Sequence, residues 1–124
     1  MHVGPQDSLI ELLQPQRSIE FNDALVESIE ETITELFSGA VVEALYAHLE
    51  TFHSISRDEV PYRLDTLFTS LEKIFGVRGS QAITRVIAKK FYPKLGLEFT
   101  DNSSRTLVEY VDEAKMKLQE SRSR

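Results

Sequence analysis

Apolar residues recur every three or four positions along most of this chain, and this spacing constrains the fold more than any other feature. Leu25, Ile29 and Ile33 form one such stripe. A period near 3.6 residues is typical of amphipathic helices, whereas strands alternate every second residue. We therefore predict an all-α protein, a compact bundle of about five helices with no sheet.

Capping residues, glycines and prolines set the expected boundaries. Ser8 and Glu11 fit a capping box and Pro15 would stop the helix after them, which predicts a short helix within an N-terminal arm of residues 1–20. Asn22 is the expected N-cap of the next helix. A chain of 124 residues is the size of one domain, expected over residues 1–124. Further helices are expected at about 22–37, 40–52 and 80–92. Another should carry Leu64 to Phe75 and end at Gly76, and Pro61 either ends the turn before this helix or opens the helix itself. A last helix is expected from Ser104 or Thr106, with a frayed tail at 120–124.

Two segments look alike. LFSGAVVEALYAHL and IFGVRGSQAITRVIAKKFY each read as a helix, a glycine-containing turn and a second helix. One hypothesis is a pair of pseudo-repeated helical hairpins followed by a C-terminal helix. The alternative is that any two amphipathic hairpins resemble each other at this level. Between the two segments, Ser56 and Glu59 form a further capping box, and a helical turn is expected from Arg57.

The expected core consists of the apolar stripes of these helices. Tyr92 is expected on the outer face of the helix at 80–92, together with Arg85 and Lys89. The core residues are Leu25, Ile29, Ile33, Leu36, Phe37, Val41, Leu45, Leu49, Leu67, Phe68, Leu71, Phe75, Ile83, Val86, Ile87, Phe91 and Val111.

Four segments carry a resemblance: ALYAHLE, DEVPYRLDTLFTSLEKIFG, ITRVIAKKFYPKLGLEF and LVEYVDEAKMK. Together they resemble a group of small, uncharacterised helical proteins from archaea, over about residues 40–117. That group carries no known activity, so the resemblance implies an all-helical intracellular domain and no particular site.

Several classes of function find no support in the sequence. With no cysteine there is no disulfide, thiolate nucleophile or Cys-based metal site. His48 and His53 are five residues apart, so a chelating pair one helical turn apart is not formed. No nucleophile elbow or Gly-rich phosphate loop is present. We expect no catalytic residue, cofactor or metal site, and a protein that is not an enzyme.

Location follows from the same kind of reading. No apolar run approaches the roughly 20 residues of a membrane span. The N-terminal residues show no basic region followed by an apolar core. We expect a cytoplasmic protein without membrane contact.

Charge is distributed unevenly. Residues 18–56 hold eight acidic and no basic side chains, whereas residues 78–94 hold five basic and no acidic ones. Such poles can steer a charged partner or a second copy of the chain. We therefore expect a protein–protein interaction or regulatory domain that self-associates. The candidate interaction surface is Arg78, Arg85, Lys89, Lys90, Lys94, Glu27, Glu30, Glu31 and Glu35.

Lys90 is unusual because the helical wheel places it between Ile83 and Val86, inside the apolar arc. A lysine there commonly extends its amine to water from the helix end. Less often it meets a carboxylate across a helix interface or marks a surface covered by a partner.

Nucleic-acid binding is the alternative hypothesis. Residues 63–91 have two helices around a glycine-containing turn, and the second helix is basic, as in helix-turn-helix proteins. The net charge of −6 weighs against it, because neutralisation of phosphates dominates DNA affinity.

Overall fold

The computed structural model describes residues 3–102 and 104–123, and side chains over 20–102 and 104–120. The described residues form five helices and no strand, which confirms the predicted all-α class. The helices are α1 (Val3–Leu36), α2 (Gly39–His53), the 3-10 helix η1 (Arg57–Tyr62), α3 (Leu64–Lys94) and α4 (Leu107–Ser123).

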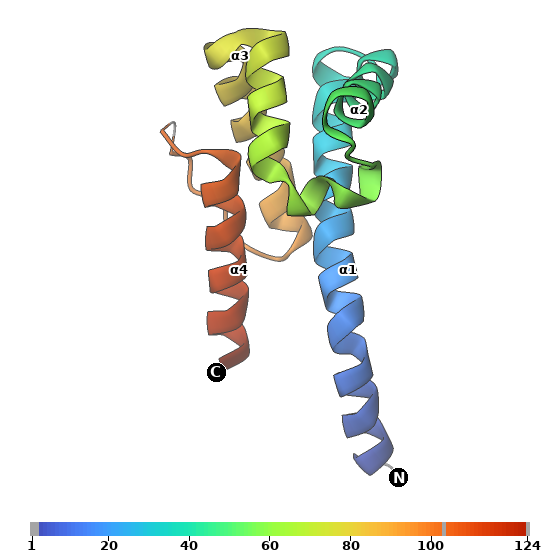
Figure 1. Cartoon of the computed structure of the whole chain (residues 1–124). Helices are drawn as coiled ribbons and strands as arrows, with labels where there is room; N and C mark the ends of the chain where they lie inside the picture. Colours follow the sequence, from blue (N-terminus) through green and yellow to red (C-terminus); the bar gives the residue numbers. More distant parts are fainter. Residues whose placement is uncertain (1–2, 103, 124) are drawn as a thin grey trace.

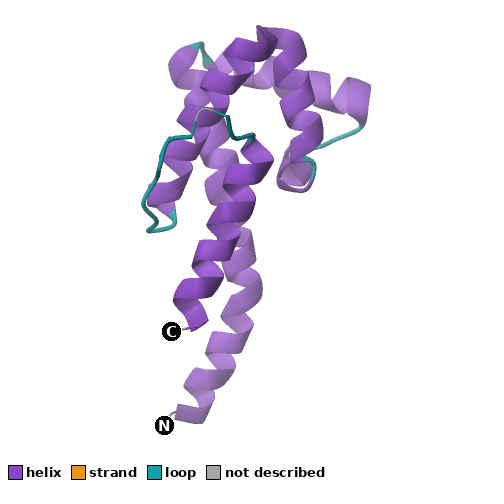
Figure 2. Cartoon of the chain, turned by 90° about the vertical axis from the view of Figure 1, so that its left-hand side faces the viewer, coloured by secondary structure: helices purple, strands orange, loops and turns teal. Residues whose placement is uncertain are grey.

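The helices form a body from which two helix ends extend (Figure 1). α3 rises beside the upper part of α1, turns at the upper end and runs back down. α2 follows directly on the upper end of α1. The N-terminal part of α1 and the C-terminal part of α4 reach beyond the body on the same side (Figure 2). The opposite, upper end is closed by the α1–α2 junction and the turn of α3.

One cluster of buried apolar side chains takes members from all five helices. Leu36 and Phe37 were expected in it, but 46% and 48% of their surfaces are exposed, so this part of the prediction is wrong. Both lie where α1 ends, close to the turn into α2. The predicted core residues that are buried are Leu25, Ile29, Ile33, Leu45, Leu49, Leu67, Leu71, Ile83, Ile87, Phe91 and Val111; Val41, Phe68, Phe75 and Val86 are partly buried.

Tyr92 was expected on the outer face of α3 but is fully buried. Its hydroxyl lies 2.7 Å from both the carbonyl oxygen of Tyr110 and Oε1 of Glu113, which accept its hydrogen bond. A tyrosine can be buried when its hydroxyl has such a partner. The helical wheel did not predict the burial of Tyr92, because α4 covers a second side of α3.

α3 consists of two helices that meet at Gly76, where φ is 81° and ψ is 170°. Only glycine adopts this backbone conformation without strain, so the predicted stop at Gly76 is confirmed. At Gly79 the space is tight: an added Cβ would lie 3.0 Å from Cβ of Phe75. The chain therefore forms two successive helical hairpins followed by α4, as the sequence suggested, while a repeat relation between them stays a prediction.

α1 differs from its prediction, because it is continuous from Val3 to Leu36 where a short helix, an arm and a second helix were expected. The backbone stays helical through Pro15, because a proline removes one hydrogen bond of the ladder and the neighbouring bonds can persist. Asn22 is not an N-cap; its Nδ2 donates to the hydroxyl of Tyr62 at 2.8 Å. At the other end, α4 is helical through Ser123, so the described part of the predicted frayed tail is helical.

Local signals close to the turns were more accurate. The carboxylate of Glu59 accepts the backbone N–H of Ser56 at 2.9 Å, as the capping box predicted. Glu109 likewise accepts the N–H of Thr106 at 2.8 Å, which selects Thr106 over Ser104 as the start of the last helix. These contacts depend on residues three positions apart, so sequence alone identifies them.

Candidate functional site

The acidic face of α1 and the basic end of α3 pair with each other within one chain. Nζ of Lys94 lies 2.9 Å from a carboxylate oxygen of Glu27 and 3.1 Å from one of Glu31. These hydrogen bonds, with Glu27 first, raise the pKa of Lys94 above its ordinary value. Two helices that the sequence marked as surfaces for a partner thus neutralise one another.

Lys90 continues this line of pairs. Its Nζ lies 2.7 Å from a carboxylate oxygen of Glu35, and 26% of the Lys90 side chain is exposed. Lys90 therefore takes one of the roles expected for a lysine in the apolar arc: it pairs with a carboxylate on another helix. Because both partners belong to the same chain, Lys90 does not need a second protein to be satisfied.

Glu30 is also paired, but with another element. Nε of Arg57 in η1 donates to it at 2.6 Å, and the hydroxyl of Tyr46 in α2 donates at 2.5 Å. Partial burial alone would raise the pKa of the Glu30 carboxyl, but these hydrogen bonds outweigh burial and hold the pKa below its ordinary value. The Tyr46–Glu30–Arg57 cluster ties α1, α2 and η1 together.

The remaining cations of the candidate surface are divided. Arg85 forms a two-pronged pair with Asp101, with N···O distances of 3.0 and 2.5 Å. The Arg85 hydrogen bonds, and after them the charge of Lys89, lower the pKa of Asp101. Lys89 itself is exposed and forms no ion pair among the described residues, and the same holds for Arg78. The five cations therefore do not form one free basic surface.

A second tyrosine cluster, which the sequence analysis missed, joins α3 to α4. Glu113 accepts from the Tyr92 hydroxyl and forms an ion pair with Arg105. The Arg105 guanidinium, followed by the Tyr92 hydroxyl, holds the pKa of Glu113 below its ordinary value. Glu113 and Lys117 are four residues apart in α4, a spacing that predicts an ion pair. This pair has an N···O distance of 3.9 Å and is longer than the pair of Glu113 with Arg105.

The upper end of the molecule exposes apolar side chains instead. The rings of Phe37 and Phe75 stack with centroids 4.7 Å apart and an angle of 19° between their planes. This stack joins the end of α1 to the turn of α3, and Leu36, Ile74 and Val77 beside it are 46%, 46% and 58% exposed. We call these five residues the apex. Four of the seven large apolar side chains exposed among the described residues belong to it.

Another exposed aromatic side chain lies on α2. Phe52, near the C-terminal end of this helix, is 70% exposed, and its ring centroid lies 4.9 Å from that of His48. The exposed positions between Phe37 and Phe52 include Ala40, Ala44 and Ala47. The exposed side of α2 thus carries a row of small apolar side chains, bordered by the exposed Glu43 and Glu50.

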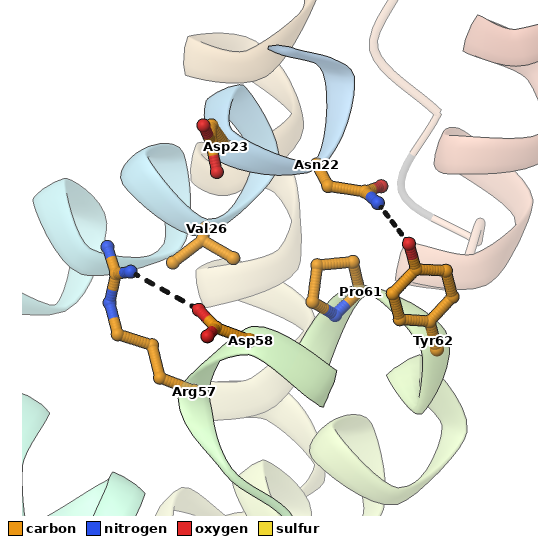
Figure 3. A pocket seen from close by; sticks show the side chains of 7 residues that line it. All are labelled: Asn22, Asp23, Val26, Arg57, Asp58, Pro61 and Tyr62. Atoms are coloured by element: carbon orange, nitrogen blue, oxygen red, sulfur yellow. Dashed lines mark hydrogen bonds and ion pairs between the residues drawn. The ribbon is translucent and has the colours of Figure 1, made fainter. Parts of the chain in front are cut away.

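A shallow pocket of about 220 Å³ lies between α1 and η1 (Figure 3). Asn22 and Tyr62 bond to each other at one side, and Arg57 and Asp58 face each other at 4.0 Å at the other. The volume is below the roughly 300–1,000 Å³ of small-molecule sites. The guanidinium of Arg57, which lines the pocket, is already paired with Glu30, so it is not a free cation for a ligand.

The two histidines of α2 lie near each other. The rings of His48 and His53 lie 5.7 Å apart, but the described residues contain no group of three His, Cys, Asp or Glu side chains arranged for a metal. None of the described helices has the length and hydropathy needed to cross a bilayer.

Comparison with protein-family models, with curated proteins and with solved structures found no match. The resemblance of residues 40–117 to small archaeal helical proteins therefore stays a prediction.

Proposed function

We propose that this chain is a non-enzymatic helical interaction domain that associates with a protein partner, including itself, through the apex. One observation carries the proposal: the exposed apolar side chains gather at one end of the molecule, around the Phe37–Phe75 ring stack. A cytoplasmic location and a regulatory role, expected from the sequence, form part of the same proposal.

The energetics favour the apex over the charged helices. Burying apolar surface contributes about 25 cal/mol per Å². Exposed ion pairs contribute only about 0–1 kcal/mol each, and a new pair at Lys90 or Lys94 would first break the internal pair with α1. Seven of the nine candidate charges thus form ion pairs within the described part of the monomer, all but Arg78 and Lys89, and the apolar end is exposed to a partner.

Nucleic-acid binding has less support. Arg85, Lys90 and Lys94 are paired with carboxylates, which leaves Arg78 and Lys89 as the cations of the basic segment without an ion pair in the described part of the chain. Two phosphate contacts give little affinity at physiological salt. A mobility shift with generic duplex DNA checks this alternative, and binding that Arg78→Glu with Lys89→Glu abolishes would establish it.

Val77→Asp tests the proposal. Val77 is exposed and starts the second half of α3, where a carboxylate suits the positive end of the helix dipole, so the fold should be retained. Met116→Asp is the matched control, because Met116 in α4 is equally exposed, 57% against 58%, and lies outside the apex. Light scattering over a concentration series should show oligomers for wild type and Met116→Asp, and monomers for Val77→Asp. Equal association of all three chains would contradict the proposal.

A further inference from the structure

The outer side of α2 has the features of a surface that another helix covers. It carries small side chains at Ala40, Ala44 and Ala47, which permit close approach of a second helix. It ends in Phe52, a large aromatic side chain that is 70% exposed and too far along α2 to join the apex of its own chain. Aromatic side chains are enriched at protein–protein interfaces.

Unpaired charges near these two surfaces are complementary. Lys73 and Arg78 flank the apex in α3, and both are exposed with no ion-pair partner among the described residues. Glu43 and Glu50 are exposed on α2 and equally lack an ion-pair partner in the described part of the chain. The apex thus has a basic border, while α2 is an apolar helix with an acidic border.

Resting on the proposed function, we propose that the partner of the apex is α2 of a second copy of this chain. The two α2 helices lie antiparallel around a two-fold axis near Ala44. Phe52 of each copy then covers the apex of the other, so that one symmetric contact uses both surfaces twice.

The sequence spacing fits this arrangement. Phe52 lies eight residues after Ala44, and α2 begins at Gly39, directly after Phe37 of the apex. An antiparallel pair centred on Ala44 therefore brings the last turn of one α2, with Phe52, to the first turn of the partner's α2 and the apex beside it. Along the helix axis, Glu50 comes level with the partner's Ser38, at the start of the partner's α2. Glu43 stays at the border of the contact, in water, where like charges are screened.

Cysteine crosslinking tests the register, since the chain contains no cysteine of its own. Ala44→Cys should crosslink to itself under mild oxidation, because Cα atoms at the axis come within about 7 Å. Ala40→Cys alone should not, because the two copies of position 40 are about 12 Å apart along the helices. A mixture of Ala40→Cys and Ala47→Cys should crosslink, and Asp112→Cys on exposed α4 is the control that should not.

Phe52→Asp provides a second readout that leaves the apex intact. It should weaken dimerisation at least about tenfold, as removal of a central aromatic anchor does. One result would overturn this inference and leave the proposed function standing. In that result Val77→Asp abolishes the dimer, Phe52→Asp does not weaken it, and Ala44→Cys does not crosslink it. A wild-type chain that stays monomeric at every concentration would overturn both.

Discussion

At the scale of single residues, two clusters join the helices, and each consists of a tyrosine, a glutamate and an arginine. Tyr46, Glu30 and Arg57 connect the N-terminal elements, and a second cluster of Tyr92, Glu113 and Arg105 connects α3 to α4. In each, a carboxylate accepts from a phenol and pairs with a guanidinium. Burial and the adjacent carboxylate raise the pKa of both tyrosines, so each phenol stays protonated and donates.

Removing one buried hydroxyl tests the second cluster. We expect Tyr92→Phe to lower the free energy of unfolding by about 1–2 kcal/mol, because the Glu113 carboxylate and the Tyr110 carbonyl lose a buried donor. Tyr62→Phe is the control: Tyr62 is 74% exposed, and its loss should stay below about 0.5 kcal/mol. Urea denaturation measures both, and equal losses would show that the Tyr92 hydroxyl is not a structural donor.

The same carboxylates predict how stability depends on pH. The pKa values of Glu30 and Glu113 are lower in the folded chain than the ordinary value of 4.5. The unfolded chain therefore binds more protons near that pH, so stability is full above 4.5 and is lost as the pH falls through the folded pKa values. Glu113→Gln cannot titrate there, so its urea midpoint should fall less steeply between about pH 7 and about pH 3. Parallel slopes for the two chains would be the contrary result.

At the scale of elements, sequence signals were accurate where they are local. The turn of α3 at Gly76 and the capping boxes at Ser56 and Thr106 each depend on a few neighbouring residues. The long α1 was not predicted, because Pro15 and Asn22 favour a break locally and the helix continues through both. Propensities of single residues are weak against the hydrogen-bond ladder of a whole helix.

The glycine at this turn allows a direct test. Gly76→Ala should destabilise the chain by at least about 1 kcal/mol, because φ is 81° and an L-residue is strained there. Gly39→Ala is the matched control, since Gly39 opens α2 without a positive φ and a Cβ added to it would have nothing within 4 Å. We expect Gly39→Ala to be neutral or stabilising in thermal unfolding. A neutral Gly76→Ala would mean that the turn adopts another conformation in solution.

At the scale of the whole molecule, the sequence showed the two charged segments and not their relation. Residues 18–56 and 78–94 are far apart in the chain, and only the fold brings Lys94 to Glu27 and Lys90 to Glu35. The apex could not be predicted for the same reason. Leu36 and Phe37 continue an apolar stripe, and their exposure depends on where α1 ends relative to α3.

The dependence of self-association on salt tests the central claim most directly, because it separates an apolar contact from a charged one. Raising sodium chloride from about 0.1 M to about 1 M shortens the Debye length from about 10 Å to about 3 Å. Each copy carries a net charge of −6, so screening reduces the repulsion between two copies while the apolar contact at the apex persists. Sedimentation equilibrium should therefore give an association constant that is unchanged or higher at the higher salt concentration. An association constant that falls steeply with salt would contradict the account and return the contact to the charged helices.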